Sequence, residues 1–153
     1  ERTGVAEEHF FAFYLRNKLG ARFHHRPRND SGHRLLLAGL PDEQHEIAML
    51  LFGLAANEQG YHLLTLGANM PTEELARVAR KTGSDAIVLS GAVQPPETVL
   101  NQDLPRLVKS ISIPVFVGGQ ASVLAADAIS KAGAEALGQD MELGLRRLNS
   151  RLS

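Results

Sequence analysis

One histidine of this sequence follows a carboxylate by two residues, in the segment Glu43-Gln44-His45. The apolar run 34–38 comes shortly before it and is bounded by Gly39 and Pro41, which is typical of a buried parallel strand. We therefore expect His45 at the carboxyl end of a strand, beside the start of a helix. There its imidazole could bind a metal while the Glu43 carboxylate accepts the other ring N–H. A surface or capping histidine is the plainer interpretation.

These donors restrict the kind of metal site. One histidine and one glutamate are too few for a closed zinc site. They suit a metal that arrives inside a macrocycle and lacks only an axial ligand. Cysteine is absent, which excludes thiolate ligands, disulfides and a cysteine nucleophile. Dinucleotide-binding, Walker-type and serine-hydrolase motifs are absent as well.

The elements that must position these residues alternate along the chain. Short apolar runs predict strands at 34–38, 62–66, 86–90, 113–117 and 135–137. Helical patterns lie between and after them, at 44–59, 72–81, 97–110, 121–132 and 140–151. Pro105 is expected to interrupt the third of these helices, and Thr72 is expected to cap the second. The sequence therefore predicts an α/β domain with a flavodoxin-like or Rossmann-like five-stranded parallel sheet, order 2-1-3-4-5, in a three-layer αβα sandwich.

Such folds bind ligands beyond the carboxyl ends of the strands. The loops concerned are 39–44, 67–71, 91–96 and 118–122. Ser90 ends the third predicted strand, and Gly118 and Gly119 follow the fourth. A phospho-receiver domain shares this topology, but it needs acidic residues after the first and third strands and a lysine after the fourth. Here the third strand ends in Ser90-Gly91-Ala92, and no lysine follows the fourth.

Composition narrows the function further. The 153 residues have a formal net charge of -1, so this stretch is a poor candidate for binding nucleic acid. No apolar run approaches the ~20 residues of a membrane span, and no signal peptide is visible, so we expect a cytoplasmic protein.

The first residues differ from the rest. Residues 5–19 are apolar around most of a helix, and such a helix needs partners on several sides. We therefore predict three parts: 1–21 as the last helix of a truncated upstream helical bundle, 22–33 as a linker, and 34–153 as the α/β domain. An ordinary amphipathic helix docked on the following domain is the alternative for the first part.

Three elements of the sequence together resemble the motif of cobalamin-binding domains, DxHxxG, SxL and GG at set spacings. Glu43 to Ala48 occupy the first element, Ser90 to Ala92 the second, and Gly118-Gly119 the third, separated by residues 49–89 and 93–117. The sequence departs from the motif at Glu43, Ala48 and Ala92.

The resemblance implies base-off, His-on binding, in which the dimethylbenzimidazole tail leaves the cobalt and enters a slot between sheet and helices. His45 would be the lower axial ligand, and Ser90 would line the tail slot. Gly118 and Gly119 would let the backbone approach the tail, although a plain strand-to-helix turn also explains them. The Ala48 methyl group would crowd the tail and weaken binding.

Glu43 resembles one subgroup, the light-dependent MerR-type repressors that use adenosylcobalamin. In that subgroup a Glu-His pair on a bundle helix covers the upper face of the cofactor, and Glu8-His9 would match it. The implied function is a non-enzymatic photosensor that self-associates as a dimer or tetramer. Operator DNA would be bound only through a domain outside this chain.

Two other functions stay open at this point. A corrinoid carrier protein of a methyltransferase system, holding methylcobalamin, has a bundle and a fold of the same kind. A degenerate, cofactor-free interaction domain would keep the fold and lose the ligand.

Overall fold

The computed structural model describes residues 32–40 and 47–152, which form a five-stranded, all-parallel sheet. Its order is β2-β1-β3-β4-β5, as predicted. The strands are β1 (Arg34–Gly39), β2 (His62–Thr65), β3 (Ala86–Ser90), β4 (Val115–Gly118) and β5 (Glu135–Gly138).

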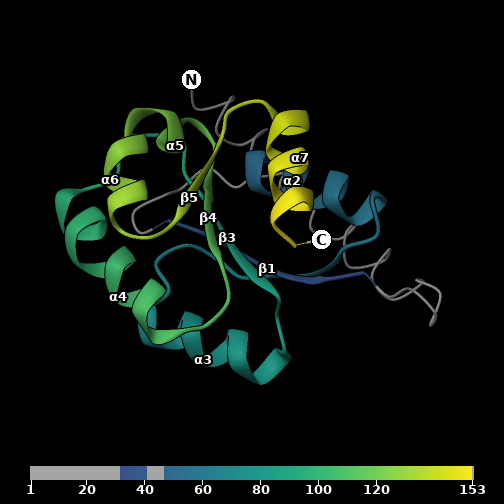
Figure 1. Ribbon diagram of the computed structural model, residues 1–153, viewed down its shortest axis with the longest axis horizontal. Coiled ribbons are helices and arrows are strands. Elements are labelled where there is room, and N and C mark those ends of the chain that lie inside the picture. The colour runs from purple at the N-terminus through teal and green to yellow at the C-terminus, as the bar shows by residue number, and fades with distance from the viewer. Residues whose placement is uncertain (1–31, 41–46, 153) are drawn as a thin grey trace, which may run out of the picture.

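Helices cover both faces of this sheet (Figure 1). One face carries α2 (Ile47–Glu58) and α7 (Met141–Leu152). The other carries α3 (Thr72–Thr82), the π-helical turn η1 (Val99–Asp103), α4 (Leu104–Ser110), α5 (Gln120–Leu124) and α6 (Ala126–Lys131). The three-layer αβα fold class predicted from the sequence is therefore confirmed.

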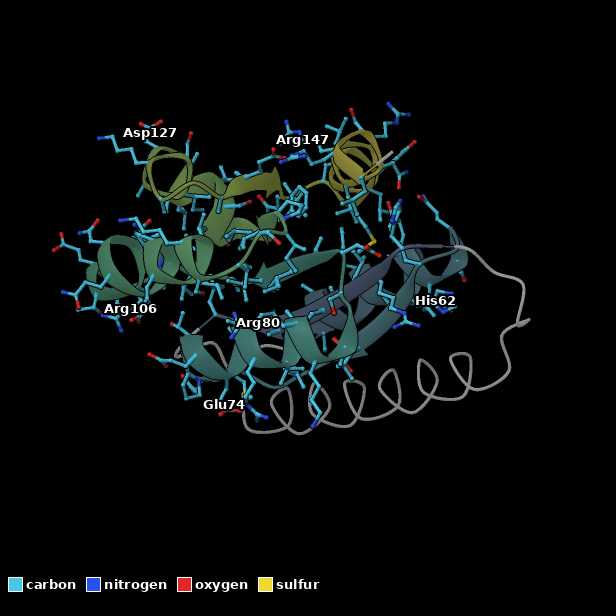
Figure 2. All side chains as sticks on the ribbon, turned by 60° about the horizontal axis from the view of Figure 1, so that its bottom comes forward. His62, Glu74, Arg80, Arg106, Asp127 and Arg147 are labelled. Atoms are coloured by element: carbon cyan, nitrogen blue, oxygen red, sulfur yellow. The ribbon has the colours of Figure 1, made fainter. Side chains whose placement is uncertain are left out.

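Alternating side chains of the strands supply two cores. In β1, Leu35 and Leu37 pack under α2 and α7, while Leu36 and Ala38 pack under the opposite helices. This follows from the two-residue period of a strand. Burying each such leucine stabilises the fold by roughly 1.5–3 kcal/mol. The charged side chains of Glu74, Arg106 and Asp127 point away from the sheet in Figure 2.

The start of α3 differs from its prediction. The helix begins at Thr72 itself, and Pro71 occupies the capping position with an extended ψ of 145°. The Pro71 carbonyl accepts the N–H groups of Glu74 and Leu75, so no side-chain cap is used. Proline suits this position because it has no N–H to leave unpaired and a fixed φ.

The predicted interruption at Pro105 is confirmed, and its form is a wider turn. Residues Val99–Asp103 are π-helical, and α4 follows with the proline in its first turn. The region 121–132, predicted as one helix, is divided at Ala125, whose φ of -119° leaves the helical region. Ala121, Ala125 and Ile129 are all buried, so the face that packs on the sheet continues across the division.

Candidate functional site

Small residues form the last row of the sheet at its carboxyl edge. Gly39 of β1, Ser90 of β3 and Gly118 of β4 are neighbours in register. The row two residues earlier contains Leu37, Val88 and Phe116. Residues two apart share a face of a strand. On the face under α2 and α7, large side chains are therefore followed at the end of the sheet by residues with small side chains or none.

A slot lies beside these small residues. It lies between the end of the sheet and the helices α2 and α7, and its volume is about 70 Å³. Its lining is mostly apolar: Leu37, Ala48, Met49, Phe52, Val88, Ser90, Gly118, Gly119, Leu137, Gly138, Gln139, Asp140, Met141 and Gly144. Four residues singled out from the sequence, Ala48, Ser90, Gly118 and Gly119, are thus brought together from three separate parts of the chain.

Close packing of α7 closes one end of the slot. A Cβ placed on Gly144 would lie 3.6 Å from the Leu137 Cβ and 3.6 Å from a ring carbon of Phe52. These are ordinary contact distances, so α7 lies close to both β5 and α2 at Gly144. The side chains of Phe52 and Leu137 line the slot.

Gly118 and Gly119 are glycines for different physical reasons. Gly119 has a φ of 81°, and a Cβ there would collide with the carbonyl oxygen of Gly91. Its N–H donates to the Gly138 carbonyl at 3.2 Å, and the Gly91 carbonyl accepts from the Ala121 N–H at 3.0 Å. The turn into α5 therefore requires glycine at 119 whether or not a ligand is bound.

Gly118 has no such requirement. A Cβ at this position would meet the Leu137 side chain at 3.8 Å, which is ordinary contact. Its φ is not positive. The absence of a side chain at Gly118 leaves the slot open, and the backbone conformation does not require glycine there.

Ser90 supplies a hydroxyl at the slot. The residue is partly exposed, and its hydroxyl makes no hydrogen bond to another described residue, while its carbonyl accepts from the Leu40 N–H at 2.9 Å. The hydroxyl is therefore available to a polar group entering the slot.

Sequence reasoning missed the buried Ser122. Its hydroxyl donates to the Gly119 carbonyl at 2.7 Å and accepts from the Gly138 N–H at 3.0 Å, so it ties together two glycines of the slot wall. In the sequence, only its position three residues after Gly119 could have indicated that it contacts this turn. Asp140 was missed too: its carboxylate accepts from the Leu143 N–H at 3.0 Å and caps α7.

The remaining predicted site residues lie outside the described part of the chain: Glu8, His9, Glu43 and His45. Ala48 is described and lies exposed at the mouth of the slot, in the first turn of α2. Within residues 32–40 and 47–152 there is no group of three or more metal-ligating side chains. Over the same residues no helix has both the length and the apolar character of a membrane span.

The fold and slot define a class: a doubly wound α/β domain with a mostly apolar slot beside α2 at the carboxyl edge of its sheet. Solved structures share this fold. A cobalamin-binding protein from Desulfitobacterium hafniense aligns with a TM-score of 0.64 at 16% identity, over 80% of this chain and 60% of that one. The methanol:cobalamin methyltransferase complex MtaBC from Methanosarcina barkeri gives 0.66 at 16% identity, over 82% and 48%. The monomethylamine corrinoid protein of the same organism gives 0.60 at 18% identity, over 86% and 63%.

Two sequence relatives are more specific. The chain is 30% identical over 120 residues to the HTH-type transcriptional repressor CarH of Myxococcus xanthus, covering 77% of this chain and 40% of CarH. It is 28% identical over 119 residues to the repressor CarA of the same organism, covering 77% and 41%. The chain thus spans about two fifths of each repressor. No family profile matches it. Together, the sequence likeness to these repressors and the shared fold confirm the predicted resemblance to cobalamin-binding domains.

Proposed function

We propose that this chain is the cobalamin-binding sensor domain of a light-responsive transcriptional regulator. In this proposal base-off, His-on adenosylcobalamin controls the self-association of the regulator and its release from DNA. The observation that carries the proposal is the meeting of Ala48, Ser90, Gly118 and Gly119 in one slot at the edge of the sheet. Likeness to the repressors CarH and CarA supports the regulatory part.

The described residues fit the kind of group proposed. The Ser90 hydroxyl is available for a polar contact, and Gly118 leaves a space that a Cβ would fill. The lining is otherwise apolar, which suits an aromatic base. His45 would hold the metal from below, with Glu43 orienting its ring. The bound cofactor would supply a cobalt–carbon bond that light can break.

The residues of the chain then have separate tasks. His45 fixes the cofactor to the α/β domain, and the slot orients the tail. Glu8 and His9 would contact the upper face from the first helix, so that loss of the upper group changes their contacts. A ligand with different contact energies in two states is what a population shift requires. DNA binding would reside in a domain outside this chain.

A corrinoid carrier is the second candidate. It is favoured by the fold shared with the monomethylamine corrinoid protein and with the complex MtaBC. In that case methylcobalamin would be the cofactor, and the mouth of the slot would face a partner enzyme. A third candidate is an interaction domain without cofactor, which is favoured by the methyl group of Ala48 at the mouth.

The test is a visible absorption spectrum of the chain mixed with adenosylcobalamin in darkness and then after green light. We expect a His-on spectrum that His45→Ala abolishes and that illumination changes. Size-exclusion chromatography of both samples tests the regulatory part, because the sensor changes its association with light and a carrier does not. Absence of any bound corrinoid in the full-length protein would leave the interaction domain.

A further inference from the structure

The strand β5 has an irregularity beside the slot. Val117 pairs with Ala136, but Gly118 pairs with Gly138, so Leu137 is an extra residue on β5. A bulge of this kind interrupts the ladder of hydrogen bonds and bends the strand that contains it. The segment that follows the bulge leads from Gly138 into α7.

One side chain from the neighbouring turn binds this segment. The Ser122 hydroxyl accepts from the Gly138 N–H at 3.0 Å and donates to the Gly119 carbonyl at 2.7 Å. The Gly119 N–H in turn donates to the Gly138 carbonyl at 3.2 Å. These three bonds link the start of α5 to the chain that leads into α7. The hydroxyl serves as donor and acceptor at once, which an alanine side chain cannot do.

The two segments joined by this link supply much of the slot lining. Gly118 and Gly119 come from the first segment, and residues 137–141 come from the second. Ser122 is 1% exposed and does not itself line the slot. Any effect of Ser122 on a ligand in the slot must therefore pass through the backbone of these two segments.

Resting on the proposed function, we propose that Ser122 is a positioning residue for corrinoid binding. Its hydroxyl holds the segment 137–141 against the Gly118-Gly119 turn before the ligand arrives. A site whose walls are already in place loses less free energy to ordering when the ligand binds. Without the hydroxyl, the Gly138 N–H loses its side-chain partner, and the ligand must order the segment itself.

The test compares Ser122→Ala with Ser84→Ala. Ser84 is the matched control, because it is 7% exposed, its hydroxyl lies 2.8 Å from the Thr82 hydroxyl, and it does not line the slot. The full chain is titrated with adenosylcobalamin in darkness and followed by visible absorbance. We expect the Kd of Ser122→Ala to be at least tenfold above that of the parent, and the Kd of Ser84→Ala to stay within twofold. Equal affinities of the two variants would overturn the inference.

Amide hydrogen exchange of the ligand-free chain gives a second measurement. In Ser122→Ala the Gly138 amide should exchange at least tenfold faster than in the parent. The amides of Val115 and Phe116 in β4 should change no more than they do in Ser84→Ala, because the loosening is local. An unchanged exchange rate at Gly138 would contradict the positioning role whatever the affinities.

Ser122→Thr is the rescue variant, because it keeps the hydroxyl. It should retain both the slow exchange at Gly138 and an affinity close to that of the parent. A folded threonine variant that binds as weakly as Ser122→Ala would overturn the inference. Thermal unfolding establishes that each variant is folded at the titration temperature. If Ser122→Ala is not, Ser122→Cys replaces it, because a thiol has a similar shape and forms weaker hydrogen bonds.

The outcomes separate this inference from the proposed function. If the parent binds adenosylcobalamin and Ser122→Ala binds it equally well, the positioning role fails and the proposed function stands. If the full-length protein binds no corrinoid, the proposed function fails and the positioning role fails with it.

Discussion

At the residue scale, two adjacent glycines illustrate how one motif can serve two purposes. Gly119 is demanded by its positive φ and by the nearby Gly91 carbonyl. Gly118 is demanded by neither, and its missing side chain leaves the slot open. The role of the pair in binding stays a prediction from the sequence. The different demands on the two glycines were not predictable, because they depend on where the Gly91 carbonyl lies.

Substitution of each glycine by alanine tests this division. Gly119→Ala should destabilise the domain by about 1–3 kcal/mol, because an L-residue would be forced into a strained backbone conformation. Gly118→Ala should be neutral or stabilising by up to about 1 kcal/mol, because glycine loses more chain entropy on folding. Urea denaturation of both variants measures the two effects. Equal losses of stability would contradict the assignment.

Tyr61 provides a pH-dependent test of packing at the opposite edge of the sheet. The residue is buried, its hydroxyl donates to the Asn149 side chain, and burial raises the pKa of its phenol above the usual 10.0. The neutral form is therefore favoured in the folded state. Its contribution to stability is fully present below about pH 10 and is lost as the pH rises through the higher folded pKa.

Tyr61→Phe should remove that contribution. We expect a loss of about 0.5–1.5 kcal/mol at neutral pH, from the missing hydrogen bond. The loss should shrink as the pH rises above about 10, where the phenol of the parent chain ionises on unfolding. Thermal melts of both chains from pH 7 to pH 11 make the comparison. A constant difference across this range would show that the phenol does not titrate as argued.

At the element scale, the sheet and its order were predictable because every strand is a short apolar run between helix patterns. The bend at Ala125 and the π-helical form of the turn before Pro105 were not. Alanine gives no local signal of a break, so the division at Ala125 was not predictable. The volume of the slot also escaped prediction, because it depends on how α2, α7 and the end of the sheet pack together in space.

The start of α7 yields a prediction for one element. Asp140 accepts the Leu143 N–H, so Asp140→Ala should destabilise the domain by about 0.5–2 kcal/mol. Asp140→Asn is the control, because asparagine caps helices about as well as aspartate does. Thermal unfolding of the three proteins distinguishes the loss of the cap from the loss of the charge. If the asparagine variant lost as much stability as the alanine variant, charge rather than capping would be the cause.

At the scale of the whole molecule, ligand binding should raise the free energy of unfolding of the domain. A corrinoid present at one hundred times its Kd should stabilise the folded domain by about 2.7 kcal/mol. For a chain of this size that corresponds to a rise in Tm of roughly 5–10 °C. Differential scanning calorimetry with and without adenosylcobalamin in darkness measures the rise. His45→Ala should abolish it, and a rise that survives the substitution would place the ligand elsewhere.

The row of small residues at the end of the sheet has a consequence for how this domain can change. Ser90 and Gly118 leave the hydrophobic core open at one corner, and a ligand would complete it. A larger side chain at Gly118 completes it as well, with no partner needed. Selection for thermal robustness alone would therefore drive this corner toward closure. If related sequences retain glycine at position 118, that retention would indicate that they still bind a ligand there, even where their other site residues have diverged.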